Sequence, residues 1–155
     1  MYKEIEGNLL DLFDEGEFDV ICHGANCFSI MGAGIAKQIK ERYPEAYEED
    51  KKTVLSSIQK LGNLTTTIVK NGHYVANLYS QAQPGPNFDE TAFRLCLKKV
   101  RLTFRAGVTI GFPQIGCGIG GGDWEKVRAI IIEELYDYFN ITVVIYKPKK
   151  NEHKQ

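Results

Sequence analysis

The residues best suited to chemistry in this sequence form two glycine-rich turns, Met31–Ile35 and Gly116–Gly122, each inside a window without a charged side chain. Each turn follows a short apolar segment and precedes an amphipathic helical pattern. Glycine permits positive φ and lets a ligand approach the backbone, while a helix start offers unpaired N–H groups and the positive end of the helix dipole. Two such turns could hold a diphosphate from both sides. For one turn alone, tight strand-to-helix packing explains the glycines equally well.

His23 lies at the end of the apolar segment before the first turn, three residues before Asn26. It could act as a general acid or base on a phosphate ester, because imidazole titrates near neutral pH. The alternative is a strand histidine whose side chain points away from the turn and bonds to a nearby backbone group. Alternation along a strand puts His23 and Asn26 on the same face only if a β-bulge intervenes.

Asp123 follows the second turn directly and precedes the last amphipathic pattern. An aspartate at a helix start caps free N–H groups, and the functional alternative is that Asp123 positions a water molecule for hydrolysis. Asp89 and Glu90 open another helical pattern, where the same two interpretations apply.

The cysteines near the turns allow two further hypotheses. Cys22, His23, Cys27 and Cys117 could be drawn as zinc ligands, but their spacing fits no recognised zinc motif, so we expect no metal. Cys117 could be a nucleophile, yet a small packing residue is the simpler interpretation without evidence for a lowered pKa.

Alternating apolar patterns predict the elements that must position these residues. Strands are expected at 3–6, 20–23, 64–69, 74–80, 108–112 and 141–146. Helical stripes are expected around 35–43, 93–104 and 124–138, with a further helix over 45–60 that has Pro44 in its first turn and Gly62 beyond its end.

Strands that alternate with helices favour an α/β fold, specifically a three-layer α/β/α sandwich with a mixed, mainly parallel sheet. In such sheets ligands bind beyond the carboxyl ends of the strands. The loops after residues 23 and 112, which contain both turns, are therefore the expected binding site.

The 155 residues, 43% apolar and 25% charged, predict a single domain over residues 1–147 and a frayed polar tail at 148–155. A net charge of −1 excludes a global positive field, so we expect no strong binding of duplex nucleic acid. Neither uncharged window reaches the roughly 20 apolar residues of a membrane span. Four cysteines without a cationic and apolar leader indicate a cytoplasmic protein.

Three segments together resemble the macrodomain family: residues 7–10, 21–36 and 112–124. The similarity runs from Gly7 to about Tyr146 and is closest to a bacterial and phage branch related to ADP-ribose-1″-phosphate phosphatases and ADP-ribosyl-glutamate hydrolases. It implies that Asn26 meets the hydroxyls of the distal ribose and that Asn8 with Leu9 meets the adenine. It further implies that the diphosphate is wrapped by Gly32, Ala33, Gly34, Ile35 and Ala36 from the first turn and by Gly116, Cys117, Gly118, Ile119 and Gly120 from the second.

The sequence departs from the family pattern at three places. Asn8 stands where many relatives have an aspartate, and its amide oxygen accepts without charge assistance. Gly120 occupies the position of the catalytic aspartate of the lysine–aspartate hydrolases, and no lysine stands near Gln81 or Ala82. That covalent mechanism is therefore not expected here.

Aromatic residues and a loop could complete the pocket. Phe28, Tyr79, Phe88 and Trp124 could stack on the adenine or cover the terminal ribose, although aromatics are usually core residues. The loop 81–87 contains Pro84 and Pro86 and is the expected variable lid, over which Phe88 could close on the ribose.

Two functions use the same pocket. The first is a hydrolase, either an ADP-ribose-1″-phosphate phosphatase or an ADP-ribosyl glycohydrolase, with Asn26, His23 and Asp123 as catalytic candidates and ADP-ribose or an ADP-ribosylated molecule as partner. The second is a reader module that binds ADP-ribose without turnover. Neither needs a cofactor. A dinucleotide-dependent oxidoreductase is a third possibility, but no G-x-G-x-x-G fingerprint follows the first strand.

Overall fold

The computed structural model describes residues 1–53 and 58–148. The strands are β1 (Tyr2–Gly7), β2 (Val20–Asn26), β3 (Leu64–Ile68), β4 (Tyr74–Gln81), β5 (Thr109–Phe112) and β6 (Asn140–Tyr146). The helices are α1 (Leu9–Asp14), α2 (Gly34–Arg42), α3 (Pro44–Lys51), the 3₁₀ turn η1 (Ile58–Lys60), α4 (Glu90–Thr103) and α5 (Trp124–Leu135). None of the helices in these two ranges is long and apolar enough to cross a membrane.

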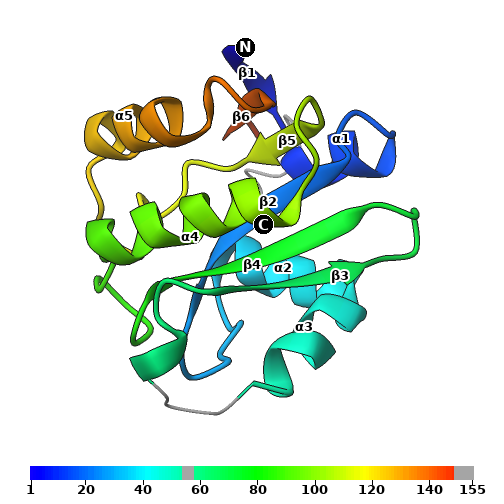
Figure 1. The fold of residues 1–155 in the computed structure, drawn as a ribbon. Coiled ribbons are helices and arrows are strands. Elements are labelled where there is room, and N and C mark those ends of the chain that lie inside the picture. Colours follow the sequence, from blue (N-terminus) through cyan, green and yellow to red (C-terminus); the bar gives the residue numbers. More distant parts are fainter. Residues whose placement is uncertain (54–57, 149–155) are drawn as a thin grey trace.

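The strands form one sheet in the order β1-β6-β5-β2-β4-β3. All neighbouring pairs are parallel except β3 and β4, which form an antiparallel pair at one edge. The mixed, mainly parallel sheet expected from the sequence is therefore confirmed. Because β6, β5, β2 and β4 run in the same direction, their carboxyl ends meet at one edge of the sheet (Figure 1).

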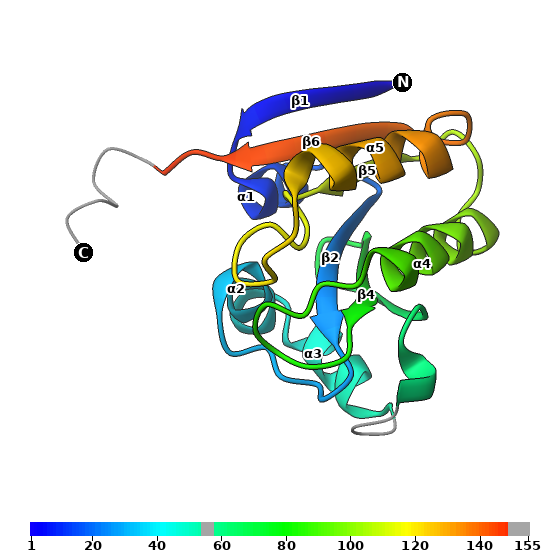
Figure 2. The same ribbon diagram turned by 90° about the vertical axis from the view of Figure 1, so that its left-hand side faces the viewer.

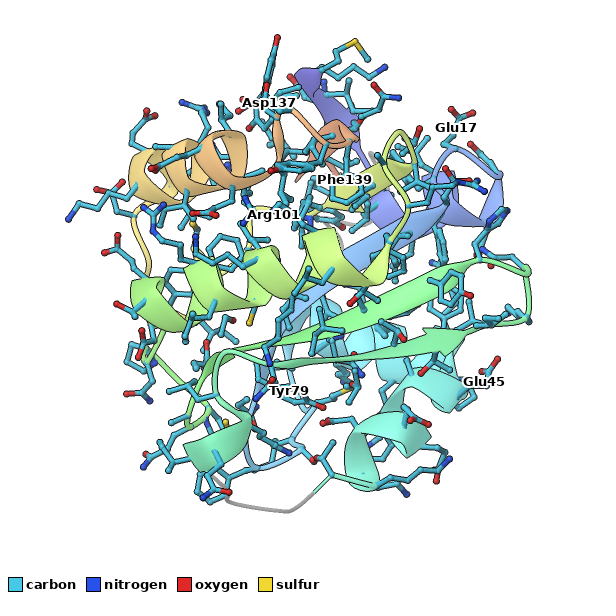
Figure 3. All side chains as sticks on the ribbon, in the orientation of Figure 1. Glu17, Glu45, Tyr79, Arg101, Asp137 and Phe139 are labelled. Atoms are coloured by element: carbon cyan, nitrogen blue, oxygen red, sulfur yellow. The ribbon has the colours of Figure 1, made fainter. Side chains whose placement is uncertain are left out.

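Helices cover both faces of the sheet, α4 and α5 on one face and α1, α2 and α3 on the other (Figure 2). Strand alternation divides the core accordingly, so that Val20 and Cys22 of β2 pack with α4 and α5 whereas Ile21 packs with α1 and α2. Phe139, after α5, belongs to the first of these clusters (Figure 3). The expected three-layer sandwich is the observed architecture.

The helix expected over residues 45–60 is wrong in its length. Helix α3 ends at Lys51, and the hydroxyl of Thr53 donates to the carbonyl oxygen of Asp50 over 2.6 Å. A side-chain hydroxyl that takes this carbonyl competes with continuation of the helix. Residues 54–57 of the expected helix, and residues 149–155 of the expected tail, lie outside the described residues.

Helix α1 was not expected from the sequence, although its signals are present. Asn8 is the N-cap and accepts a hydrogen bond from the backbone N–H of Asp11 over 3.1 Å. Leu9, Leu10 and Phe13 are buried at helical spacing. The six-residue helix is short for a periodicity argument, and its stability derives from packing against the sheet.

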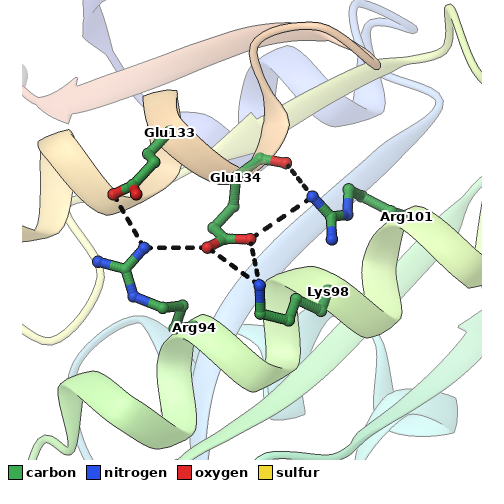
Figure 4. Close-up of polar contacts among 5 residues, drawn as sticks. All are labelled: Arg94, Lys98, Arg101, Glu133 and Glu134. Atoms are coloured by element: carbon green, nitrogen blue, oxygen red, sulfur yellow. Dashed lines mark hydrogen bonds and ion pairs between the residues drawn. The ribbon is translucent and has the colours of Figure 1, made fainter.

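Glu134 of α5 is the buried centre of an ion-pair network that joins α5 to α4 (Figure 4). Arg94 and Lys98 donate to its carboxylate over 2.9 and 3.1 Å, and a guanidinium nitrogen of Arg101 lies 3.5 Å from it. Burial alone would raise the pKa of Glu134, but the hydrogen bonds from Arg94 and Lys98 outweigh burial and lower that pKa. The carboxylate is therefore more stable in the folded than in the unfolded chain.

Replacing Glu134 by Gln removes the charge that pairs with Arg94 and Lys98, so the free energy of unfolding is expected to fall at pH 7. The loss should be only about 1 kcal/mol, because water around the more exposed cations screens these ion pairs. A lowered folded-state pKa stabilises the protein above the unfolded pKa and loses this effect as pH falls through the folded value. Urea denaturation at pH 7 and pH 3 should therefore show a difference between Glu134→Gln and the unmodified chain that shrinks in acid. An equal difference at both pH values would contradict this assignment.

Candidate functional site

A cavity of about 620 Å³ lies beyond the carboxyl ends of β6, β5, β2 and β4. These four strands cover three inter-strand spacings, roughly 14 Å, so the cavity suits an elongated ligand. The lining residues come from the first turn and α2 (Ile30, Gly32 to Ala36, Gln38), the second turn (Pro113 to Gly120), the strand ends (Gly24 to Asn26, Ser80, Gln81, Val144, Tyr146) and the flanking segments (Asn8, Leu9, Pro84, Gly85).

The first turn is shaped by the Asn26 side chain. Its Oδ1 accepts from the backbone N–H groups of Phe28 and Ile30, and its Nδ2 donates to the carbonyl oxygen of Ile30 over 2.8 Å. Helix α2 then begins with Ala33 as N-cap, which provides no side-chain hydrogen bond. The first N–H groups of α2 are thus open to an anion at the positive end of the helix dipole.

A buried polar network anchors the same turn from behind. Ser29 has a positive φ of 56°, and its hydroxyl donates to the Asp50 carboxylate over 3.1 Å. Tyr79 of β4, labelled in Figure 3, donates to the same carboxylate oxygen over 2.6 Å, and Lys60 donates to the Ser29 hydroxyl over 3.2 Å. An unusual backbone conformation persists only where its surroundings hold it, and here Asp50 and Lys60 do so.

The second turn connects β5 to α5 and lies beside α2 in Figure 2. It folds on itself through backbone bonds, the shortest from the N–H of Gly122 to the carbonyl oxygen of Gly116 at 2.6 Å. The turn bonds of this described loop do not use the N–H groups of Gly118, Ile119 and Gly120. These three residues line the same cavity as the start of α2, and their N–H groups can donate to phosphate oxygens.

Glycine is required in the second turn for packing. Gly116 has a positive φ of 73°, and a Cβ atom there would collide with the Phe88 ring. A Cβ atom at Gly120 would lie 2.8 Å from the carbonyl oxygen of Gly116 and 3.2 Å from Oε1 of Gln81. An aspartate at position 120 would therefore collide with the backbone of this turn.

The two ends of the cavity differ in polarity. Next to β6 the walls are Leu9, Val144 and the half-exposed Tyr146, with Asn8 as the polar group. Next to β4 the walls are Asn26, Ser80 and Gln81. One end therefore suits a flat apolar ring and the other a hydroxylated group.

No Asp, Glu, Lys, Arg or His is among the cavity-lining residues in the described part of the chain. Cys117 does line the cavity, but burial and the nearby Asp123 raise the pKa of its thiol. Cys117 is therefore a poor nucleophile at neutral pH, and it donates to the carbonyl oxygen of Ile115 over 3.2 Å.

Every residue that the family resemblance assigns to ligand contact lines this cavity. They are Asn8, Leu9, Asn26, Gly32, Ala33, Gly34, Ile35, Ala36, Gly116, Cys117, Gly118, Ile119 and Gly120. The structure thus brings together segments that are up to 112 positions apart in the chain, counted from Asn8 to Gly120. Their contact with a ligand stays a prediction.

His23 does not belong to the cavity lining. It is fully buried, and its Nε2 lies 2.5 Å from Oδ1 of Asn77, whose Nδ2 donates to Ala46 in α3. Burial lowers the pKa of His23, which keeps the imidazole neutral near pH 7. The structure places His23 on the α3 side of the sheet, away from a general acid or base position. Its partner in β4 is the Asn77 side chain, and a backbone hydrogen bond with Gly24 also acts on the ring.

Asp123 also lies outside the cavity lining. It is the N-cap of α5 and accepts from the N–H of Glu125 over 3.0 Å, so the capping alternative is the observed role. Asp89 likewise caps α4 by accepting from the N–H of Ala92. In both cases, capping of a helix N-terminus accounts for the aspartate.

The aromatic candidates do not cover the cavity. Phe88 packs under Gly116 and against Phe93, with ring centroids 5.5 Å apart, because the glycines above it leave room for its ring. Tyr79 bonds to Asp50, while Phe28 and Trp124 are not lining residues. The loop 81–87 does line the cavity through Pro84 and Gly85, and the Gln81 amide holds it by donating to the carbonyl oxygens of Gln83 and Gly85.

The sequence analysis missed several polar or aromatic lining residues, namely Gln38, Ser80, Gln81, Gln114 and Tyr146. Ser80, Gln81 and Tyr146 end parallel strands, which is a signal that could have identified them. Gln38 and Gln114 carry no such signal, because their position depends on how α2 and the second turn pack.

Gly120→Ala is expected to destabilise the protein by about 1–3 kcal/mol, because the new methyl group overpacks the second turn against Gly116. Gly118→Ala is a matched control, since a Cβ atom there meets nothing within 4 Å. Urea denaturation should show a change below about 0.5 kcal/mol for the control. Equal effects of the two substitutions would contradict the packing argument.

The comparison with known proteins identifies relatives of this chain. The Macro domain family model matches residues 22–131. An uncharacterised 17.5 kDa protein of Enterobacteria phage T4 is 35% identical over 153 residues, covering 94% of this chain and 97% of that protein. The ADP-ribose glycohydrolase OARD1 of Bos taurus is 28% identical, covering 88% of this chain and 86% of the relative.

Among solved structures, a protein of unknown function from Bacteroides thetaiotaomicron superposes with a TM-score of 0.75 at 29% identity, covering 94% of this chain and 98% of that one. The family model extends over both glycine-rich turns and the ends of β2, β4 and β5. The chain belongs to the macro domain family.

Proposed function

We propose that this chain binds ADP-ribose in the cavity and hydrolyses an ADP-ribose derivative. One observation carries the proposal: both glycine-rich turns line a single cavity whose ends differ in polarity. A diphosphate between the turns would leave a base at one end and a sugar at the other. The proposal includes a single domain working in the cytoplasm, and the four free thiols fit that reducing compartment.

The diphosphate would lie between the start of α2 and the N–H groups of residues 118–120. Backbone N–H groups and a helix dipole stabilise a dianion without a charged side chain. The adenine would lie against Leu9, Val144 and Tyr146. Asn8 already uses Oδ1 to cap α1, so its Nδ2 is the group that can donate to a ring nitrogen.

The terminal ribose would then lie at the β4 end beside Asn26. Asn26 Nδ2 has two N–H bonds and the contact to Ile30 uses one, so one donor is left for a sugar hydroxyl or a water molecule. We therefore propose Asn26 as the residue that orients the reacting end, and we assign no such role to His23 or Asp123.

Hydrolysis is supported by the relative OARD1, which is named an ADP-ribose glycohydrolase. The lining lacks the lysine and aspartate of a covalent mechanism, because Gly120 stands at the aspartate position and no lysine stands near Gln81 or Ala82. Catalysis would instead rest on positioning, with neutral dipoles orienting the substrate and a water molecule and the substrate's own groups assisting the attack.

Gly32→Glu is expected to weaken ADP-ribose binding by roughly 100-fold or more, because a carboxylate would face the diphosphate and like charges cost several kcal/mol. The fold should tolerate the change, since a Cβ atom at Gly32 comes no closer than 3.8 Å to Ile30. Calorimetric titration with ADP-ribose measures the affinity of both proteins.

Gly32→Gln is the matched control of nearly equal size and no charge, and it should weaken binding less than Gly32→Glu. Equal affinity of the unmodified chain and Gly32→Glu would place the ligand elsewhere. No binding of ADP-ribose by the unmodified chain at millimolar concentration would reject the proposed function.

Turnover is expected for at least one substrate among ADP-ribose-1″-phosphate, ADP-ribosylated acidic residues, ADP-ribosylated DNA ends and acetylated ADP-ribose. The rate should show no inflection near pH 6.5, because the histidine next to the cavity is buried and bonded away from it. Chromatographic detection of released products between pH 5.5 and 8.5 measures the turnover and its dependence on pH. Binding without turnover of any substrate would favour a reader, and an inflection abolished by His23→Gln would return His23 to the mechanism.

A further inference from the structure

Ser80 has a hydroxyl group without a hydrogen-bond partner in the described structure. The residue is 1% exposed and lies on the cavity floor at the end of β4. Its Oγ is among the few buried polar atoms that make no hydrogen bond. An unsatisfied buried hydroxyl costs about 1–3 kcal/mol, so its position calls for a partner that the protein does not provide.

The sheet register explains why Ser80 stands apart from its neighbours. Ala25 of β2 pairs with Tyr79, but the next residue, Asn26, pairs with Gln81. Ser80 is therefore the extra residue of a β-bulge between the two strands that form the polar end of the cavity. A bulge re-aims a side chain at the cost of regular pairing, and bulges are frequent beside functional sites.

Gly24 of β2 lies beside this hydroxyl. A Cβ atom at Gly24 would lie only 3.0 Å from Ser80 Oγ, and Gly24 itself lines the cavity. A methyl group at Gly24 would therefore press on the Ser80 hydroxyl. Gly24, Ser80 and Asn26 line the same end of the cavity.

We propose that Ser80 Oγ is a positioning group that hydrogen-bonds a hydroxyl of the terminal ribose. This inference rests on the proposed function, which puts a sugar at this end of the cavity. A serine hydroxyl both donates and accepts, which matches a sugar hydroxyl better than a fully ionised phosphate. The ligand then supplies the partner that the folded chain lacks.

The test compares the affinities of ADP-ribose and ADP, because ADP lacks the terminal ribose. Ser80→Ala is expected to weaken ADP-ribose binding about 3- to 10-fold, the effect of one hydrogen bond, and to leave ADP binding unchanged. Its melting temperature should stay equal or rise, because the substitution removes an unsatisfied polar atom. Gly24→Ala should weaken ADP-ribose binding in the same selective way, since its methyl group would lie about 3.0 Å from Ser80 Oγ and displace that hydroxyl.

Thr67→Val is the matched control. Thr67 Oγ1 is also buried without a partner, but it belongs to β3 and does not line the cavity. It should change neither affinity. Equal weakening of ADP and ADP-ribose by Ser80→Ala, unchanged affinity for both, or a lowered melting temperature would overturn the role of Ser80. If the unmodified chain does not bind ADP-ribose, the proposed function itself is rejected. If the unmodified chain binds ADP-ribose and Ser80→Ala binds it with the same affinity, only the role of Ser80 is rejected.

Discussion

The cavity depends on the parallel alignment of β6, β5, β2 and β4, because this alignment brings the ends of four strands to one edge of the sheet. A strand that ended at the opposite edge would remove its loop from the cavity. The helices follow from the same constraint, since each parallel connection must cross a face of the sheet and returns through α2, α4 or α5. The two glycine-rich turns are thus opposed by topology, although they lie far apart in the chain.

The absence of a charged side chain from the described lining decides what kind of chemistry this cavity can perform. A dianion bound here would meet backbone N–H dipoles, which do not titrate at any ordinary pH, so its recognition would not depend on a titrating residue. The same feature would leave no strong base beside a bound sugar. Rate acceleration must then come from geometry, which makes the orientation of Asn26 and of neighbouring hydroxyls the important variable.

The sequence was sufficient to predict the sandwich, the strands within a few residues and both turns, because these rest on local periodicity and on glycine chemistry. It was not sufficient where tertiary contacts decide. The end of α3 follows from the Thr53 hydroxyl, and the bulge at Ser80 is a register shift between two strands that no local pattern encodes. Phe88 was assigned to the ribose, yet the glycines above it reveal a packing role that depends on how the second turn folds back.

The two turns reach similar chemistry by different physical means. Side chains shape the segment that leads into the first turn, where Asn26 accepts from Phe28 and Asp50 accepts from Ser29, and Gly32 has free space around it. Backbone packing shapes the second turn, where Gly116, Gly120 and Gly122 are crowded by Phe88 or by one another. An aspartate at position 120 would therefore need a different turn, and not merely a different residue. The glycine at that position links the neutral character of the cavity to the packing beneath it.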